Sequence, residues 1–481
     1  MTQARSKTNL NAVLAIAGGM FLLARLARRH SPARGRRHPE AGKTGLNPTQ
    51  HKVVVVGAGF GGLQASLRFA RCAGIDLTLI DAHNHHLFQP LLYQVATAAL
   101  SPSDIASPVR GIIPASSHAR VIMATVTGVN IESRHVVCDV GAIPYDDLII
   151  ATGSRPSYFR HPDWAQAAHS LKTLDDALDV RTRILGAFER ASTAGNLDER
   201  ARQLTFVLVG GGPTGVEMAG SIAELVRDTL PRDYGTAASE ARIILIEAGP
   251  RVLNGFPPDL SRNAAQALAS LGVEIRTGSR VTGIDRARVS LHNESIPAAT
   301  VLWTAGTEAT PVAEWLGVKP GHGGRVPVDA NLSVADHPEI RVIGDAALVT
   351  GQDGKPLPGL APVAKQQGRY VSRIIIGRLA GRRLSPFRYR DYGNLATIGR
   401  NRAVAEFGRV HLTGTPAWLA WAAAHIFFLI SYRNRVMVTA QWAFTYATRR
   451  RGGQLITGRS SEGSATMALL PGHPPPVAKP G

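Results

Sequence analysis

The stretch Val53–Gly62 reads VVVVGAGFGG, and it decides how the rest of the chain is interpreted. Four β-branched apolar residues in a row are typical of a strand that is buried on both faces of a parallel sheet. The glycines that follow predict a tight turn at Gly57, a close approach of backbone to a phosphate group at Gly59, and close packing of helix on strand at Gly62. We therefore predict a strand, a glycine-rich turn and a helix that continues through Ala70.

An acidic residue ends the next predicted strand. Residues 77–80 read LTLI, and Asp81 follows them, 24 residues after Gly57. In dinucleotide-binding folds, a carboxylate at about this distance accepts hydrogen bonds from ribose hydroxyls. Because the helix N-terminus also favours phosphate, the stretch from Gly57 to Asp81 predicts a site for the ADP part of a dinucleotide.

The same pattern occurs a second time. Residues 206–209 read FVLV and precede GGGPTGVE at 210–217, and a later strand at 243–246 ends in Glu247. Glu247 lies 37 residues beyond Gly210, which we attribute to an insertion around residues 231–241. One glycine motif is a weak signal, but two copies between a buried strand and a helix predict two dinucleotide-binding folds.

Two nucleotide-binding folds indicate two nucleotides. In the second fold, Gly210, Gly212 and Gly215 take the positions expected at a pyrophosphate, and Glu247 takes the position expected at a ribose. A carboxylate there accepts a 2′-hydroxyl but repels a 2′-phosphate, so Glu247 favours NADH over NADPH. The first fold can hold the ADP part of FAD in the same way.

Composition narrows the class of protein. A chain of 481 residues exceeds the size at which one hydrophobic core stops growing, so several domains are expected. Hydrophobic residues at 44% and charged residues at 19% exclude a disordered chain and a polytopic membrane protein. Two cysteines exclude a disulfide scaffold, a zinc cluster and a CxxC motif. No metal site is predicted, because the adjacent His85 and His86 point apart on a strand or a helix.

The positive charge lies at the two ends of the chain. The formal net charge is +19; residues 1–50 carry nine Lys and Arg against one acid, and residues 401–481 carry nine against two. Basic ends favour an anionic partner surface, either a membrane or a nucleic acid. Because this charge lies beside apolar segments and not on the globular body, we predict a lipid bilayer surface and no nucleic acid.

An apolar segment lies near the N-terminus. Residues 12–24 are nearly all apolar, but 13 residues are short against the roughly 20 that span a bilayer as a helix. A short anchor or interfacial helix and a disordered or processed leader are both compatible with this segment. Residues 30–50 are polar, rich in Pro, Gly and Arg, and predict a linker.

Two apolar stretches near the C-terminus carry aromatic residues beside arginines. Residues 417–430 contain two tryptophans, and a second stretch holds Trp442, Phe444 and Tyr446 before three arginines at 449–451. Trp and Tyr beside clustered Arg suit the boundary between lipid tails and headgroups. The alternative is an ordinary pair of core or dimer-interface helices.

Taken together, these motifs resemble the flavin-dependent pyridine nucleotide oxidoreductases that have two dinucleotide folds. LIIATG at 148–153 resembles the return strand of the FAD domain, VLWTAG at 301–306 its counterpart in the NADH domain, and RVIGD at 341–345 the second flavin motif. The resemblance implies that the FAD site includes Gly57, Gly59, Gly62, Asp81, Thr152, Gly153, Gly344 and Asp345. It implies that the NADH site includes Gly210, Gly212, Gly215, Glu247 and Gly306.

Two segments that are expected beside the flavin indicate which subfamily the chain resembles. HHLFQPLLYQ at 85–94 has no cysteine where disulfide reductases carry a redox pair, so thiol chemistry is not expected. Residues 86–94 and APVAKQQG at 361–368 instead resemble type II NADH:quinone oxidoreductases, also called alternative NADH dehydrogenases. The resemblance covers about residues 51–458, and the first 50 residues depart from it.

This resemblance implies a membrane-associated flavoenzyme with the cofactors FAD and NADH. It would transfer two electrons from NADH to a membrane quinone without pumping protons. Glu217 would lie near the nicotinamide and flavin; otherwise it is a favourable charge at a helix N-terminus. Gln366 and Gln367 would bind a quinone carbonyl or the flavin edge, and Lys365 would stabilise negative charge on the reduced groups. Otherwise these three are solvated polar groups in the first turn of a helix.

The predicted architecture is α/β, with two Rossmann-like domains and a C-terminal amphipathic helical membrane-binding region. The ranges are 1–50 for a leader or anchor and linker, 51–160 and 325–384 for a discontinuous FAD domain, 161–324 for the inserted NADH domain, 385–458 for the membrane-binding region, and 459–481 for a tail. We expect attachment to the cytoplasmic face of a bacterial inner membrane, with the mitochondrial inner membrane as the alternative. A homodimer follows from the resemblance only.

Two other functions remain open on the same fold. One is an FAD-dependent NAD(P)H reductase with a protein or oxygen as acceptor, which would not need the C-terminal Trp and Arg segment. The other is a basic flavoprotein resembling apoptosis-inducing factor, whose positive charge would form a patch on the folded body and bind DNA in a salt-sensitive way.

Overall fold

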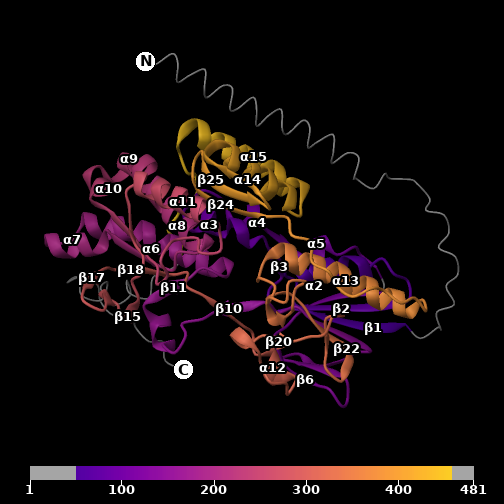
Figure 1. The fold of residues 1–481 in the computed structure, drawn as a ribbon. Coiled ribbons are helices and arrows are strands. Elements are labelled where there is room, and N and C mark those ends of the chain that lie inside the picture. Colours follow the sequence, from indigo (N-terminus) through magenta and orange to yellow (C-terminus); the bar gives the residue numbers. More distant parts are fainter. Residues whose placement is uncertain (1–49, 117, 458–481) are drawn as a thin grey trace, which may run out of the picture.

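The computed structural model describes residues 50–116 and 118–457. The predictions for the leader, the anchor and the tail lie outside the described residues. Within them, two parallel sheets lie side by side, and the C-terminal elements pack over their junction (Figure 1).

The first sheet has the predicted glycine-motif strand at its centre. Strand β1 (His51–Val56) lies parallel to β2 (Ile75–Asp81) on one side and β9 (Asp147–Ile150) on the other. The full order is β21 (Ser333–Val334), β22 (His337–Val342), β9, β1, β2 and β5 (Ala119–Met123), in which only β21 is antiparallel. Because β22 joins this sheet from far along the chain, the predicted discontinuous domain is confirmed.

Two helices cover one face of this sheet. Helix α2 (Phe60–Phe69) follows the glycine turn, and α13 (Ala361–Leu379) packs on it (Figure 1). The two backbones come so close that a Cβ on Gly368 would lie 2.1 Å from the Gly61 carbonyl oxygen. The other side carries a hairpin sheet of β6 (Val126–Asn130), β7 (His135–Cys138) and β8 (Gly141–Pro144).

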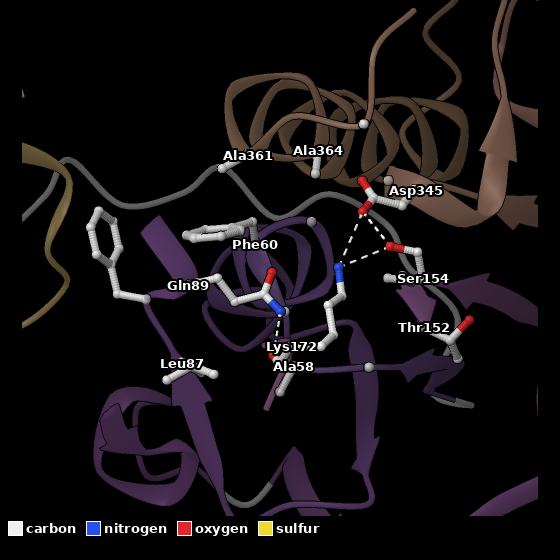
Figure 2. A pocket seen from close by; sticks show the side chains of 18 of the residues that line it. Ala58, Phe60, Leu87, Gln89, Thr152, Ser154, Lys172, Asp345, Ala361 and Ala364 are labelled. Carbon is white, nitrogen blue, oxygen red and sulfur yellow. Dashed lines mark hydrogen bonds and ion pairs between the residues drawn. The ribbon is translucent and has the colours of Figure 1, made fainter. Parts of the chain in front are cut away.

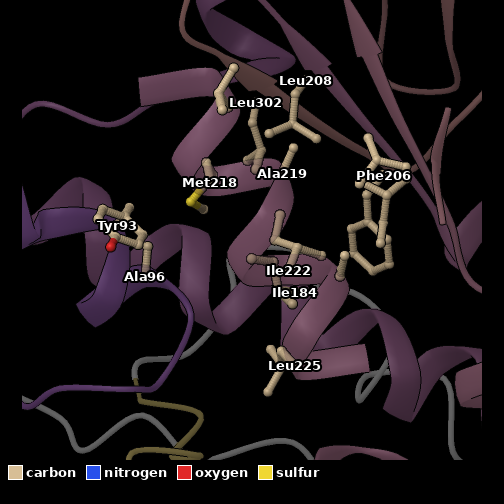
Figure 3. Packing of buried hydrophobic residues seen from close by; sticks show 14 of the residues in the cluster. Tyr93, Ala96, Ile184, Phe206, Leu208, Met218, Ala219, Ile222, Leu225 and Leu302 are labelled. Atoms are coloured by element: carbon tan, nitrogen blue, oxygen red, sulfur yellow. The ribbon is translucent and has the colours of Figure 1, made fainter. Parts of the chain in front are cut away.

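The second sheet repeats the parallel arrangement. Its order is β11 (Ala168–Ser170), β18 (Thr300–Trp303), β12 (Thr205–Val209), β13 (Arg242–Ile246) and β14 (Val273–Arg276). Helix α8 (Pro213–Glu224) follows β12 and buries Met218, Ala219 and Ile222 in a core with Phe206 and Leu208 (Figure 3). The remaining elements of this domain are α6 (Leu174–Ser192), α7 (Leu197–Gln203), α9 (Pro231–Tyr234), α10 (Thr236–Glu240), α11 (Pro258–Ser270), β15 (Val281–Ile284), β16 (Arg288–Leu291) and β17 (Ser295–Pro297). Helices α9 and α10 occupy the predicted insertion, and the α/β class with two Rossmann-like domains is confirmed.

The chain passes between the two sheets through one pair of short strands. Strand β10 (Ser154–Pro156) leads out of the first domain and pairs antiparallel with β19 (Thr307–Ala309), which leads back. Helix α12 (Val312–Trp315) already packs in the core of the first sheet. We therefore propose domain boundaries near residues 156 and 309 instead of the predicted 160 and 324.

The C-terminal region contains a sheet that no sequence pattern predicted. Strands β24 (Asn394–Gly399), β25 (Arg402–Phe407) and β26 (Val410–Thr413) form an antiparallel sheet before α14 (Gly414–Phe428) and α15 (Tyr432–Thr448). Helix α8 lies directly on β24, because a Cβ on Gly220 would lie 1.7 Å from the Ile398 carbonyl oxygen. The short Ala- and Gly-containing runs lack the alternation that predicts a strand.

Helices α14 and α15 divide their aromatic residues between the core and the surface. Trp421 and Trp442 turn inward, where their rings stack 5.2 Å apart and the Trp442 indole N–H donates to the Gln94 amide oxygen. The outward face is also apolar, with Leu419, Phe427, Tyr432, Val436, Met437 and Phe444 all exposed. None of the helices in the described part of the chain is long and apolar enough to cross a membrane.

Candidate functional site

One large cavity opens between the two sheets. It measures about 900 Å³ and is lined by the first glycine loop, the N-terminal turn of α8 and the cavity side of α14. Of the predicted site residues, it is bordered by Gly57, Gly59, Asp81, Thr152, Gly153, Glu217, Gly344, Asp345 and Lys365. Residues that are up to 308 positions apart in the sequence therefore share one cavity.

The first glycine loop has the shape that a pyrophosphate needs. Gly57 has φ +100°, and a Cβ on Gly62 would lie 1.9 Å from the Gly57 carbonyl oxygen, so turn and helix are in close contact. A Cβ on Gly59 would meet no atom within 4 Å, which leaves open space beside the N-terminus of α2. A helix N-terminus with open backbone around it favours phosphate, so the residues present fit the FAD that the motif predicts.

The strand-end acid Asp81 supports this loop. Its carboxylate accepts hydrogen bonds from the Ala58 backbone N–H at 2.6 Å and the His83 N–H at 2.7 Å. His86 binds the same loop from the other side, since its Nδ1 lies 2.7 Å from the Ala58 carbonyl oxygen. Asp81 still borders the cavity, so its remaining lone pairs can accept ribose hydroxyls.

The second glycine loop has the same geometry. Gly210 has φ +111°, a Cβ on Gly215 would lie 1.9 Å from the Gly210 carbonyl oxygen, and Gly212 faces open space. Glu247 accepts the Gly211 and Gly249 N–H groups, each at 2.6 Å. These glycines, Glu247 and Gly306 do not border the large cavity itself; the loop reaches it through Pro213 and Thr214. Their contact with NADH stays a prediction.

Lys172, which is not among the predicted site residues, also borders the cavity. The Lys172 amine donates to the Ser154 hydroxyl at 2.9 Å and lies 3.7 Å from the Asp345 carboxylate, and the Ser154 hydroxyl donates to the same carboxylate at 2.8 Å (Figure 2). Asp345 belongs to the FAD site that the family resemblance implies, so this network would hold its orientation. Lys172 follows β11 of the other sheet, and no local motif marks it.

Two ionisable predicted residues face the cavity, Lys365 from a buried position and Glu217 from a half-buried one. Burial raises the pKa of Glu217 to about 8, against the opposing effects of the Thr397 N–H and the Trp421 indole. Burial, together with the charges of nearby arginines, lowers the pKa of Lys365 to about 8, and its amine lies 4.7 Å from the centre of the Phe428 ring. Both groups can therefore exchange protons near neutral pH.

His425 is a second cavity residue without a sequence signal. Its Nδ1 lies 2.7 Å from the Trp421 carbonyl oxygen, one turn earlier in α14, so this nitrogen carries the proton of the neutral ring. Burial lowers the pKa of His425 to about 4, which keeps the ring neutral at pH 7. Its Nε2 is left as an acceptor at the cavity wall.

The two predicted glutamines take positions behind the cavity wall. The buried Gln367 accepts the Gly344 N–H through its amide oxygen at 2.6 Å. Gln366 bonds to both backbone groups of Arg390, at 2.8 and 3.0 Å. Neither borders the large cavity. We therefore propose that Gln367 positions the turn at Gly344 and that Gln366 positions the backbone at Arg390. These roles replace the predicted contact with quinone or flavin.

This placement predicts different results for the two glutamines. Gln367→Leu should lower the free energy of unfolding by about 1–3 kcal/mol and reduce flavin retention, because the half-buried Gly344 N–H loses its acceptor. Gln366→Leu should have a smaller effect, since water can reach the groups it leaves. Urea unfolding and flavin content of both purified variants measure this. Equal effects would contradict the positioning role of Gln367.

Known proteins share this organisation. The model of the pyridine nucleotide-disulphide oxidoreductase family matches residues 51–368, and the model of the NDH2 C-terminal domain matches residues 392–451. The type II NADH:quinone oxidoreductases NdhA and Ndh of Mycobacterium tuberculosis are each 39% identical to this chain over 440 residues, which is 88% of this chain and 92% and 94% of theirs. The chain belongs to the type II NADH:quinone oxidoreductase family.

Solved structures agree on the fold. The NDH2 of Plasmodium falciparum, solved in complex with RYL-552, superimposes with a TM-score of 0.78 over 85% of this chain and all of that chain, at 20% identity. Family membership also accounts for the C-terminal sheet and helices, because the second family model covers β24 to α15.

Proposed function

We propose that this chain transfers two electrons from NADH, through bound FAD, to a membrane quinone and does not pump protons. The observation that carries the proposal is the shared cavity. The first glycine loop, the N-terminal turn of α8 and helix α14 of the NDH2 C-terminal domain all border it. Such a cavity can bring an electron donor and an apolar acceptor to one bound cofactor.

The bound FAD would accept hydride and pass on electron pairs, and the protein supplies position, charge and protons. In this proposal Asp81, Asp345 and the first glycine loop hold FAD, and the second loop with Glu247 holds NADH. Glu217 supplies a proton at the cavity, and Lys365 stabilises the negative charge that develops beside it. The Phe428 ring excludes water from the Lys365 side.

Rapid mixing tests this function. The purified protein should show a flavin spectrum, be bleached quickly by NADH and much more slowly by NADPH, and be reoxidised by a short-chain quinone. The NADH preference follows from the carboxylate of Glu247, which repels a 2′-phosphate. Bleaching without reoxidation by quinone would move the acceptor to a protein or to oxygen, and folded protein without flavin would remove the enzymatic function.

We further propose that the outward faces of α14 and α15 dock on a lipid surface. Leu419 and Phe427 on α14 and Phe444 on α15 expose 42–58% of their surface, and Arg433 in the first turn of α15 is exposed as well. Apolar side chains flanked by arginine suit anionic headgroups over lipid tails. Attachment to the cytoplasmic face of a bacterial membrane and a homodimer belong to the same proposal.

Vesicle sedimentation measures this docking. The full chain should sediment with anionic phospholipid vesicles, and the double variant Phe427→Glu and Phe444→Glu should lose most of this binding, because a carboxylate opposes insertion and repels anionic lipid. Val140→Glu provides a matched control, since Val140 is 62% exposed on a distant hairpin and should leave binding unchanged. Equal loss in all variants would contradict a docking face on α14 and α15.

A further inference from the structure

A second, smaller cavity adjoins the first. It measures about 120 Å³ and is enclosed by α8, strand β24 and the two C-terminal helices. Glu217 borders both cavities, so its carboxyl group lies between them. None of the functions assigned above uses the second cavity.

One face of helix α8 supplies the polar wall of this cavity. Glu217, Ser221, Glu224 and Asp228 all border it, and their spacing of four, three and four residues places them on one side of the helix. The opposite side carries the apolar residues of the core, which anchors the helix (Figure 3). The helix continues as a π-helical turn over Leu225–Thr229, a deviation that is frequent at functional sites.

One buried polar atom in the cavity wall, the Thr445 hydroxyl Oγ1, has no hydrogen-bond partner among the described residues. The Trp421 indole, which borders the same cavity, interacts instead with the Glu217 carboxyl group. Buried polar groups rarely stay unpaired, and a polar cavity of this size has room for several water molecules. The Thr445 hydroxyl therefore points to ordered water inside the cavity.

Basic residues hold the acidic row in place. The Arg451 guanidinium is buried, lies 3.7 Å from the Glu224 carboxylate and donates to the Thr97 carbonyl oxygen at 2.8 Å. Asp228 lies 3.0 Å from Arg227 and 3.9 Å from Arg449, whose side chain is 62% exposed. The Arg400 guanidinium covers the Tyr446 ring at 3.7 Å on the remaining side. The outer end of the row thus meets bulk water, and the inner end meets Glu217.

We propose that this row, from Asp228 through Glu224, Ser221 and cavity water to Glu217, is the route by which the reaction takes up its proton from bulk water. The inference rests on the proposed function. Reduction of a quinone by NADH consumes one proton, since the hydride brings two electrons and one proton and the quinol needs two protons. Glu217 gives its proton toward the large cavity, and the row returns one from water.

A proton needs a route to Glu217 that passes through neither the large cavity nor the lipid-docking face. The large cavity would be filled by FAD and the substrates during turnover, and the docking face proposed above would be covered by lipid. Carboxyl groups, hydroxyls and water can relay a proton over this path without any movement of the backbone. Glu224 and Asp228 relay protons to Glu217 and touch no substrate, so they are not catalytic residues.

The test separates the two half-reactions in the flavin-loaded, full-length protein. The variants are Glu224→Gln, Asp228→Asn and their combination, with Glu240→Gln, an exposed carboxylate paired with Arg200, as the matched control. Without oxygen, bleaching by NADH should stay within about twofold of wild type, because hydride transfer needs no proton from water. Reoxidation by a short-chain quinone should slow about tenfold or more, and proton uptake, followed with an indicator dye, should slow with it.

Further readouts exclude a merely structural effect. Glu224→Asp, which keeps a carboxyl group, should recover much of the reoxidation rate, and the solvent deuterium isotope effect on reoxidation should increase in Glu224→Gln. Unchanged reoxidation and proton uptake in the double variant would overturn the route, as would equal slowing of both half-reactions. If wild-type protein is bleached by NADH but not reoxidised by quinone, the proposed function fails instead.

Discussion

Glu217→Gln should slow reoxidation of the reduced protein by a short-chain quinone about 10²-fold and leave bleaching by NADH much less affected. The glutamine keeps the size and the hydrogen-bonding capacity of the side chain but cannot give up a proton. A general acid with a pKa near the working pH typically contributes at least this factor. The pKa of Glu217, raised to about 8 by burial, meets that condition.

The same variant has a second readout that does not depend on turnover. Between pH 5 and pH 8 the folded protein keeps the Glu217 proton and the unfolded chain releases it, so the free energy of unfolding of wild type should fall as pH rises through this window. The amide of Glu217→Gln does not titrate and carries no charge that must be buried at pH 8. The variant should therefore be more stable than wild type at pH 8. Denaturant unfolding at both pH values measures the difference. A variant that is destabilised equally at pH 5 and pH 8, with both half-reactions slowed, would show that Glu217 has only a structural role.

Gly62→Ala should yield little folded, flavin-loaded protein. The added Cβ would lie 1.9 Å from the Gly57 carbonyl oxygen and 3.2 Å from the Ala151 Cβ, and the nearest atom belongs to backbone that cannot turn aside. Overpacking of a rigid core typically lowers the free energy of unfolding by about 1–3 kcal/mol. Because the contact here is with backbone and is this short, the loss in Gly62→Ala should be at least as large as the upper value. Soluble yield, thermal unfolding and the flavin-to-protein absorbance ratio measure the loss.

Gly59→Ala is the matched control for this substitution. A Cβ on Gly59 meets no protein atom within 4 Å, so the variant should fold with nearly unchanged stability. It should nevertheless hold less flavin, because the methyl group enters the space proposed for the pyrophosphate. Full flavin content in folded Gly59→Ala would contradict a cofactor site at this loop. A normal yield of Gly62→Ala would show that the turn can relax to make room for the methyl group.

The elements that the sequence predicted well are those whose signal is local. The run of four valines before Gly57 predicted β1, and the repeat of the pattern at 206–217 predicted β12 and α8, because strand, turn and helix follow one another without interruption. The family resemblance placed the strands at 148–150 and 341–343 in their sheets for the same reason. The sheet at 394–413 escaped prediction, because no contiguous motif marks its strands and they owe their conformation to packing on α8 and α14.

The residues of the candidate site also differ in whether a local sequence signal marks them. Local sequence motifs predict the two glycine loops, their strand-end acids Asp81 and Glu247, and the positions of Glu217 and Lys365, since each of these belongs to a contiguous motif. Only the tertiary structure placed Lys172 beside Asp345, His425 at the cavity wall and Gln367 behind that wall. The reason is that these positions depend on contacts between segments that are separate in the sequence, such as those of Lys172 and Asp345, which are 173 positions apart. Thr397 and Trp421, which partly oppose the effect of burial on the pKa of Glu217, also reach α8 only through the folded C-terminal region.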